Sequence, residues 1–428
     1  MENNQSEVLL KVEHLCQYFS MGPGQELKAV DDVNFEVRKG EVFGLVGESG
    51  CGKTTTGRSI IKLYNITSGN VYFEGQRICA GIRSYKRAVA EARAEYRREF
   101  SEVKKLVKQD ASAGQKEVRP EYADRLKAAE EKLHATVTEQ TANIKSAKRD
   151  NNYCNKIYAE EEMRKVREEY EPRLAAETDE EKRAQILKEY KENLRLAKKS
   201  RIMTKMQMIF QDPIASLDPR MTVRDIIAEG LVIRGIKDKS YIDEQVYKML
   251  DLVGLVPEHA GRYPHEFSGG QRQRIGIARA IILNPELIIA DEPISALDVS
   301  IQAQVINLLN DLRNSLGLTI MFIAHDLSVV KYFSDRIGVM YYGKMVELAP
   351  ADELFEHPLH PYTKSLLSAI PLPDPDFEKG RKRILYNPIA EHDYSKDKPE
   401  MREITPGHFI SCNQAEFEKY SAELAVGK

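Results

Sequence analysis

Apolar residues follow different periods in different parts of the chain. Residues 8–80 contain short strand-like runs separated by turns with glycine, Asp or Asn, and these runs are LLKVEHL, AVDDVNFEV, EVFGLVG and GNVYFEG. Residues 206–346 alternate the apolar runs MQMIF, LIIADEP, TIMFIAHD and IGVMYYG with helical stretches. Strands that alternate with helices predict an α/β fold with a largely parallel sheet.

Residues 82–200 carry a helical pattern instead. Their apolar residues recur at steps of three and four, in stripes such as Tyr122, Leu126, Ala129, Leu133 and Val137. These narrow stripes put one apolar seam on each helix, as in a coiled coil. We expect breaks near Gly114–Pro120, Asp150–Asn152 and Pro172–Asp179. The pattern predicts antiparallel helices, paired as hairpins or as a coiled-coil region.

Charge is concentrated in the same segment. The chain of 428 residues has 30% charged residues and a formal net charge of −3, and residues 82–200 hold 29 basic and 24 acidic residues. The rest of the chain has an ordinary charge content of about a quarter. Two interpretations of the segment stay open, a solvated helical excursion or a docking or regulatory arm.

Several classes of protein are disfavoured by composition. The longest apolar runs are far shorter than the roughly 18 residues of a membrane-spanning helix, and the start lacks the pattern of a secretory signal. The near-zero net charge gives no general attraction to nucleic acid. Five scattered cysteines without CxxC spacing suggest neither disulfides nor zinc, so we expect a reduced, cytosolic setting.

A complete phosphate-loop motif, GESGCGKT, follows the apolar run at residues 42–46. It fits GxxxxGK[ST] between a predicted strand and a predicted helix, which is the context that the motif requires. The candidate nucleotide-binding residues are Gly47, Ser49, Gly50, Cys51, Gly52, Lys53, Thr54 and Thr55. Lys53 can reach the β- and γ-phosphates, and the Thr54 hydroxyl can bind Mg²⁺. We also expect bulky thiol reagents to inhibit by attacking Cys51 and a bound nucleotide to protect it.

A second motif, LIIADE at residues 287–292, supplies carboxylates at the end of another apolar run. Asp291 is expected to hold Mg²⁺, directly or through water. Glu292 is expected to polarise the attacking water as a general base.

With these motifs, the sequence resembles the nucleotide-binding subunits of ABC transporters. Phe267 is followed by Ser268, Gly269, Gly270 and Gln271, which is similar to the LSGGQ signature of that family. The resemblance implies a P-loop NTPase of the ABC type, with a parallel-sheet core, an antiparallel β subdomain and a helical signature subdomain. It also implies that the signature contacts the γ-phosphate held by an opposite subunit.

Further elements of that family occur in the same order. Gln211 resembles the Q-loop glutamine that reaches Mg²⁺ and the lytic water, and Asp298 lies in a D-loop-like SALD. His325 resembles the switch histidine that contacts the γ-phosphate. An aromatic residue ahead of the core should stack on adenine, and spacing favours Phe19 over its rival Tyr18.

These assignments divide the chain into four parts. Residues 1–81 form the first part of the ABC core, and residues 82–200 form the charged helical insertion. Residues 201–348 complete the core, and residues 349–428 form a C-terminal extension.

The extension resembles that of one branch of the family. Residues 357–367 read HPLHPYTKSLL, similar to oligopeptide/dipeptide transporters, and residues 402–409 read REITPGHF, similar to the second ATPase subunit of oligopeptide permeases. The resemblance implies an ATP-hydrolysing subunit that powers peptide import. The implied partners are a second ABC ATPase subunit in a heterodimer, two membrane permease subunits and an extracellular peptide-binding protein. It also implies a peripheral position on the cytoplasmic face of the membrane, without nucleic acid.

Other functions remain as alternatives. Nickel and glutathione importers share the extension. ATPases of DNA repair and chromosome maintenance also interrupt an ABC core with coiled coil, but their insertion follows the Q-loop, whereas here it precedes Gln211. ATPases that act on ribosomes normally carry two ABC cores, and this chain has one of each motif.

Overall fold

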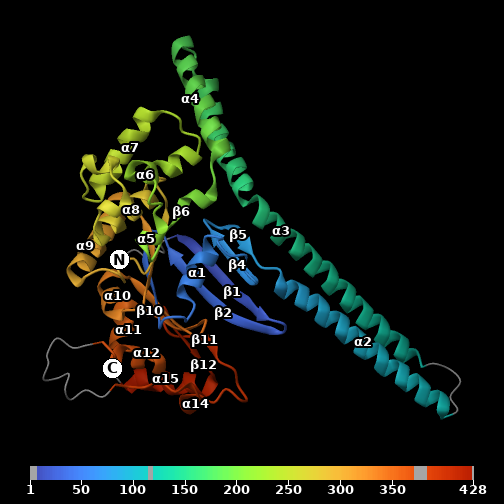
Figure 1. The fold of residues 1–428 in the computed structure, drawn as a ribbon. Helices are drawn as coiled ribbons and strands as arrows, with labels where there is room; N and C mark the ends of the chain where they lie inside the picture. The colour runs from blue at the N-terminus through green and yellow to red at the C-terminus, as the bar shows by residue number, and fades with distance from the viewer. Residues whose placement is uncertain (1–6, 114–118, 371–382, 427–428) are drawn as a thin grey trace.

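An eight-stranded sheet forms the centre of the computed structural model, which describes residues 7–113, 119–370 and 383–426 (Figure 1). In spatial order its strands are β11 (Glu400–Thr405), β12 (His408–Cys412), β10 (Lys344–Pro350), β9 (Arg336–Tyr341), β3 (Val42–Val46), β8 (Thr319–Ala324), β7 (Leu287–Asp291) and β6 (Met206–Ile209). The five strands from β9 to β6 are parallel, and β10, β12 and β11 continue the sheet antiparallel. The buried strands β3, β7 and β8 are the continuous apolar runs of the sequence, as expected for a parallel sheet covered on both faces.

A second sheet of four strands is antiparallel throughout. Its spatial order is β2 (Gln25–Arg38), β1 (Val8–Gly22), β4 (Ser68–Phe73) and β5 (Gln76–Ala80). One apolar cluster joins the two sheets, and within it the rings of Phe35 and Phe43 stack with centroids 5.0 Å apart. The predicted α/β core with an antiparallel β subdomain is therefore confirmed.

Helices cover the central sheet and build a separate helical subdomain. They are α1 (Lys53–Ile60), α5 (Pro213–Ser216), α6 (Val223–Ile233), α7 (Lys239–Leu252), α8 (Gly269–Ile281), α9 (Val299–Leu316) and α10 (Leu327–Phe333). One apolar cluster contains buried residues of α6–α10 and of the central strands. Figure 1 shows α6, α7 and α8 grouped at one end of that sheet.

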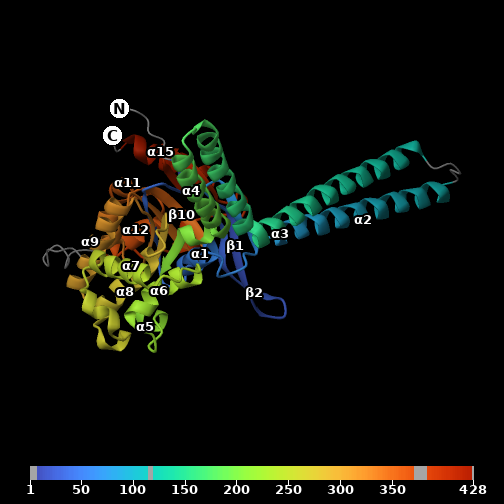
Figure 2. The ribbon, with the colours of Figure 1, turned by 90° about the horizontal axis from the view of Figure 1, so that it is seen from above.

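Two helical hairpins arise from the charged segment. Helix α2 (Arg83–Ser112) pairs with the first part of α3 (Pro120–Ala176), and α4 (Glu180–Lys199) pairs with its last part. Figures 1 and 2 show the α2–α3 hairpin projecting away from both sheets, with α4 at the opposite end of α3. The predicted antiparallel pairing is confirmed. None of the helices in the described ranges has the length and apolar content to cross a bilayer.

The predicted break at Asp150–Asn152 is wrong, because α3 continues through it for 57 residues, about 85 Å. The break at 114–120 does separate α2 from α3, although residues 114–118 lie outside the described ranges. Near Pro172 the helix runs on to Ala176, and Asp179 caps the start of α4.

The middle of α3 is fixed to β5, and this contact explains the missed continuity. Asn151 Oδ1 accepts from the N–H of Ala80 at 2.8 Å, and Asn151 Nδ2 donates to the carbonyl of Ala80 at 2.7 Å. Arg77 pairs with Asp150 at 2.6 Å. Cys154 is buried in the cluster shared by the two sheets. These tertiary contacts outweigh the low helix propensity of asparagine.

The predicted C-terminal extension, residues 349–428, is an integral part of the fold. It contains α11 (Ala351–Glu356), α12 (Pro361–Ser368), α14 (Pro388–Glu391), α15 (Gln414–Val426) and the hairpin β11–β12. Strand β12 pairs with β10, so the extension adds two strands to the central sheet.

Candidate functional site

The phosphate loop links the end of β3 to the start of α1. Lys53 is 4% exposed, and its Nζ donates to the carbonyls of Gly47 at 2.8 Å and Glu48 at 3.0 Å. The ammonium therefore lies inside the loop. Gly52 has φ of +105°, and a Cβ there would lie 2.1 Å from the carbonyl oxygen of Ala29, so only glycine fits.

A short hydrogen bond joins the loop to β7. Thr54 Oγ1 donates to Asp291 Oδ1 at 2.6 Å, and Asp291 is completely buried at the carboxyl end of its strand. Burial raises the pKa of Asp291, although the Thr54 hydrogen bond and the charge of Arg58 oppose the shift. Asp291 Oδ2 accepts no hydrogen bond within the described structure. A hydroxyl beside an unsatisfied carboxylate oxygen fits Mg²⁺, which prefers oxygen ligands.

Two predicted catalytic side chains, Gln211 and His325, converge on one carboxylate oxygen of a third, Glu292. Gln211 Nε2 donates to Glu292 Oε2 at 2.9 Å, and His325 Nδ1 lies 3.6 Å from the same oxygen. Glu292 has a φ of +43°, an uncommon conformation for a residue other than glycine, and it directly follows Asp291. Such backbone strain is characteristic of functional sites. The structure thus brings Gln211, Glu292 and His325 together beside Asp291.

The signature residues form a separate group at the start of α8. Ser268 caps this helix by accepting from the N–H of Gln271, and Gln271 Oε1 accepts from the N–H of Ser268 in return. A Cβ on Gly270 would lie 2.6 Å from Ile301 Cγ2, so the signature packs closely against α9, whose N-cap is Asp298.

The structure does not bring the signature to the phosphate loop of the same chain. In the ranges that it describes, no hydrogen bond or ion pair links Ser268, Gly269, Gly270, Gln271 or Asp298 to residues 47–55. Ser268, Gly269 and Asp298 are exposed, and Gly270 and Gln271 are half-buried, so this group is accessible to another subunit.

The two aromatic candidates for adenine have different surroundings. Tyr18 donates its hydroxyl to Asp31 on the adjacent strand, and the ammonium of Lys28 lies 5.2 Å from its ring. Phe19 packs edge-on against Tyr64, shortly after the end of α1, with centroids 5.4 Å apart. Phe19 remains the candidate, and Tyr18 its alternative.

One site residue, Cys51, differs from its expectation, and another, Arg58, was not predicted. Cys51 is only 5% exposed and burial raises the pKa of its thiol, so the expected ready attack by thiol reagents is disfavoured. Sequence reasoning missed Arg58, whose guanidinium lies 3.8 Å from Asp291 Oδ2. Its position one helical turn after Thr54 is a signal that could have identified it.

A cavity of about 1060 Å³ opens beside Gln211, between β6, α6 and the end of α4. Its lining includes Phe210 and Ile233. The cations of the lining outnumber its two carboxylates, Asp212 and Glu229, and they are Arg58, Lys198, Lys199, Arg201, Arg234 and Arg279. The lining of the cavity therefore combines apolar side chains with an excess of cations.

Two family models match parts of this chain. A family model described as "ABC transporter" matches residues 30–171 and 173–295. A second model, "Oligopeptide/dipeptide transporter, C-terminal region", matches residues 346–398. Both matches agree with the resemblances found in the sequence.

Relatives match over nearly the whole chain. The oligopeptide transport ATP-binding protein OppF of Bacillus subtilis is 46% identical over 417 residues, covering 97% of this chain and all of that protein. The dipeptide transport ATP-binding protein DppF of Lactococcus lactis is 41% identical, covering 98% of each chain. Among solved structures, cbiO1 of Clostridium perfringens aligns with a TM-score of 0.48 and 19% identity, covering 82% of this chain and 92% of that one. On its family matches and its relatives, the chain belongs to the ATP-binding subunits of oligopeptide and dipeptide ABC transporters.

Proposed function

We propose that this chain binds and hydrolyses ATP to power the import of oligopeptides or dipeptides through separate membrane permease subunits. The observation that carries the proposal is the convergence of two groups of residues on adjacent carboxylates. Lys53 and Thr54 lie on the phosphate loop next to Asp291, while Gln211 and His325 meet at Glu292. This arrangement supports ATP binding and hydrolysis at neighbouring positions near the end of β7.

Each side chain has a distinct task in this mechanism. Lys53 turns its ammonium from the loop carbonyls toward the phosphates, and the N–H groups of the loop bind the same oxygens. Thr54 and Asp291 would hold Mg²⁺, which would supply positive charge to the phosphates. Glu292 accepts a proton from the attacking water. Gln211 and His325 orient the Glu292 carboxylate through the shared oxygen.

The signature residues act on a second subunit in this proposal. Ser268 and the N-terminus of α8 face an anion in the partner, which suits a helix N-terminus with exposed N–H groups. Asp298 lies at the same proposed interface between the two subunits. A second ABC ATPase subunit then completes each nucleotide site, and we infer a heterodimer that closes on ATP and opens after hydrolysis.

The cavity beside Gln211 provides the surface for a permease subunit. It adjoins both the hydrolytic glutamine and β6, so a movement of Gln211 would reach the bound partner directly. The chain would work at the cytoplasmic face of the membrane, supplied with peptide by an extracellular binding protein. Residues 82–200 would form an inserted unit between the core parts 1–81 and 201–348, followed by the extension 349–428.

Purification of the native complex followed by mass spectrometry tests the proposal. Peptide-permease membrane subunits and a second ABC ATPase are the expected partners. Recovery of DNA-repair or chromosome-maintenance proteins instead would overturn the transport function. Uptake assays with labelled peptide, nickel and glutathione in a deletion strain then separate the solutes, and the proposal requires that peptide uptake is lost.

A further inference from the structure

The C-terminal extension reaches the phosphate loop through one side chain, Tyr362 of α12. Its hydroxyl accepts a 3.0 Å hydrogen bond from the backbone N–H of Glu48, the second residue of the loop. The carbonyl of Glu48 accepts a 3.0 Å bond from Lys53 Nζ. The main chain of Glu48 is therefore held from two sides, by Lys53 within the loop and by Tyr362 outside it.

Tyr362 is itself fixed by its surroundings. The residue is 2% exposed, and its ring centroid lies 4.4 Å from that of Tyr341 and 5.6 Å from that of Tyr386. Its backbone N–H donates to Nδ1 of His360 at 3.1 Å. Because its ring and its backbone are both held, Tyr362 loses little further side-chain entropy when its hydroxyl binds the N–H of Glu48.

The start of α12 is anchored to the central sheet by a buried carboxylate. Glu347 of β10 is completely buried and accepts from the N–H groups of Leu359 at 2.8 Å and His360 at 3.1 Å. His408 Nε2 of β12 lies 2.8 Å from Glu347 Oε1. This buried acid is thus satisfied by partners from both ends of the extension, which fixes the position of α12 on the sheet.

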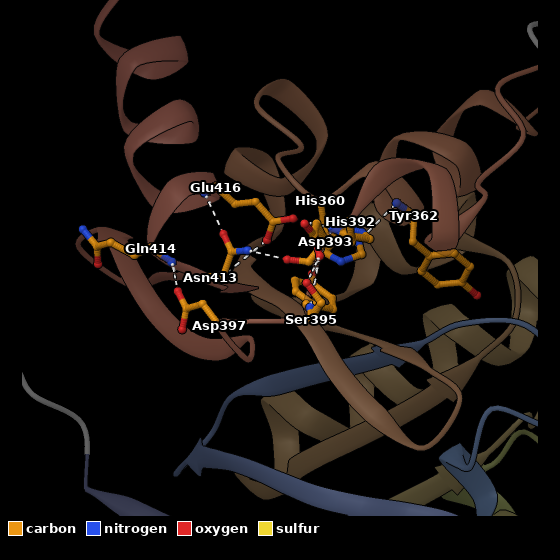
Figure 3. A network of polar contacts seen from close by, with 10 residues as sticks. His360, Tyr362, His392, Asp393, Ser395, Asp397, Asn413, Gln414 and Glu416 are labelled. Carbon is orange, nitrogen blue, oxygen red and sulfur yellow. Dashed lines mark hydrogen bonds and ion pairs between the residues drawn. The ribbon is translucent and has the colours of Figure 1, made fainter.

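A second polar network holds the other side of the same segment (Figure 3). The rings of His360 and His392 lie 5.2 Å apart, and His392 Nδ1 lies 2.6 Å from Glu416 Oε1 of α15. Figure 3 shows the ring of Tyr362 pointing away from this network. The extension therefore holds its own helices together through one set of side chains and contacts the phosphate loop through another.

We propose that Tyr362 is a positioning residue that keeps the phosphate loop in its ATP-binding shape. The inference rests on the proposed ATP-binding function of the loop. When Lys53 turns to the phosphates, it gives up bonds to the carbonyls of Gly47 and Glu48, which are its present partners. The hydrogen bond from the N–H of Glu48 to Tyr362 does not involve Lys53, so it persists when ATP binds. The start of the loop, at Gly47 and Glu48, therefore stays ordered. A loop ordered before binding loses less entropy when ATP binds.

The test compares Tyr362→Phe with Tyr386→Phe in the full chain. Tyr386 belongs to the same aromatic cluster, and the described structure gives its hydroxyl no hydrogen bond to the phosphate loop. Tyr362→Phe should raise both the Kd and the KM for ATP by about 2- to 10-fold, the range for one hydrogen bond, and leave kcat within about twofold. Amide exchange at Glu48 should accelerate in Tyr362→Phe and stay unchanged in Tyr386→Phe.

Three results would overturn the inference. They are an unchanged Kd in Tyr362→Phe, an equal loss of affinity in both variants, and a fall in kcat at constant KM. An equal loss would mean that general packing of the extension, rather than the hydroxyl, supports the loop. Failure of the unsubstituted chain to bind ATP would instead overturn the proposed function, so the two failures are distinguishable.

Discussion

The hydroxyl of Thr54 donates a 2.6 Å hydrogen bond to the buried carboxylate of Asp291, joining residues 237 positions apart. The two residues come from the first turn of α1 and the last position of β7. Since the second oxygen of Asp291 accepts no hydrogen bond in the described structure, this oxygen and the Thr54 hydroxyl can act as ligands of a cation. Asp291 is thereby a site where function conflicts with stability.

Asp291→Asn should remove Mg²⁺-dependent hydrolysis and also stabilise the nucleotide-free protein. Burial raises the pKa of Asp291, so the folded state favours the protonated form. The stability from this preference is complete below the ordinary pKa of 3.8 and is lost as pH rises through the raised pKa. At neutral pH the ionised carboxylate therefore opposes folding, whereas a neutral asparagine can still accept from Thr54.

Thermal unfolding in EDTA measures this effect. The unfolding temperature of Asp291→Asn should exceed that of the unsubstituted chain at pH 8, and the difference should shrink as the pH is lowered. A variant that is less stable at pH 8 without Mg²⁺ would show that the ion pair with Arg58, rather than burial, dominates the energetics of Asp291.

Glu292→Gln should separate ATP binding from hydrolysis. The amide keeps the shape of the side chain and can still bond to Gln211, but it cannot accept a proton from water. The rate of hydrolysis should fall by about 10²–10⁴-fold, the usual contribution of a general base, while the Kd for ATP changes little. Single-turnover hydrolysis and equilibrium binding measure the two quantities separately.

Glu258→Gln is a matched control for that variant, because Glu258 is exposed and lies in the turn Pro257–Gly261. It should hydrolyse ATP at the normal rate. If Glu292→Gln also retained the normal rate, the general base would have to be another group. The contacts of Gln211 and His325 with Glu292 Oε2 would then stabilise the structure without a role in catalysis.

Sequence patterns predicted the sheet strands well because their signals are local. Strands β3, β7 and β8 are unbroken apolar runs, and the phosphate loop is a contiguous motif. The meeting of Gln211 with Glu292 could be inferred only from the resemblance to a family, since 81 residues separate them.

Two features escaped prediction because distant contacts determine them. Helix α3 continues through Asn151 because the backbone of Ala80 in β5 forms hydrogen bonds with the Asn151 side chain. Helix propensity depends on local sequence and cannot reveal a partner 71 residues away. The hairpin β11–β12 was missed although Pro406 and Gly407 form a typical turn between two short runs. Its strands are recognisable as strands mainly because β10 offers an edge for pairing.

Asn151→Ala tests how strongly the arm is fixed to the core. The substitution leaves the N–H and carbonyl of Ala80 without their side-chain partner. Each lost hydrogen bond costs about 0.5–1.5 kcal/mol, so the free energy of unfolding should fall by about 1–3 kcal/mol.

Denaturant unfolding measures this free energy, and the neighbouring exposed Asn152 supplies the control. Asn152→Ala should leave stability unchanged or slightly raised, because alanine favours helix. An equal effect of both substitutions would contradict a specific role for Asn151.

A shortened arm distinguishes a solvated excursion from a docking or regulatory arm. The structure rules out removal of the whole segment as a clean test, because Cys154 and Tyr158 of α3 belong to the core. Lys132 and Glu95 face each other at 2.7 Å, so a short Gly-Ser linker in place of residues 97–130 closes the hairpin where its helices are adjacent. The remaining contacts of α3 with β5 are untouched.

The expected stability of this shortened protein is close to that of the full chain, since the removed part is largely exposed. ATP hydrolysis by the purified protein should also be unchanged. Peptide uptake in cells then separates the two interpretations. Normal uptake and regulation would leave the distal hairpin as a solvated excursion, while reduced uptake with normal ATP hydrolysis would establish it as a docking or regulatory arm. Loss of ATP hydrolysis would contradict both, because it would mean that the distal hairpin supports the nucleotide site itself.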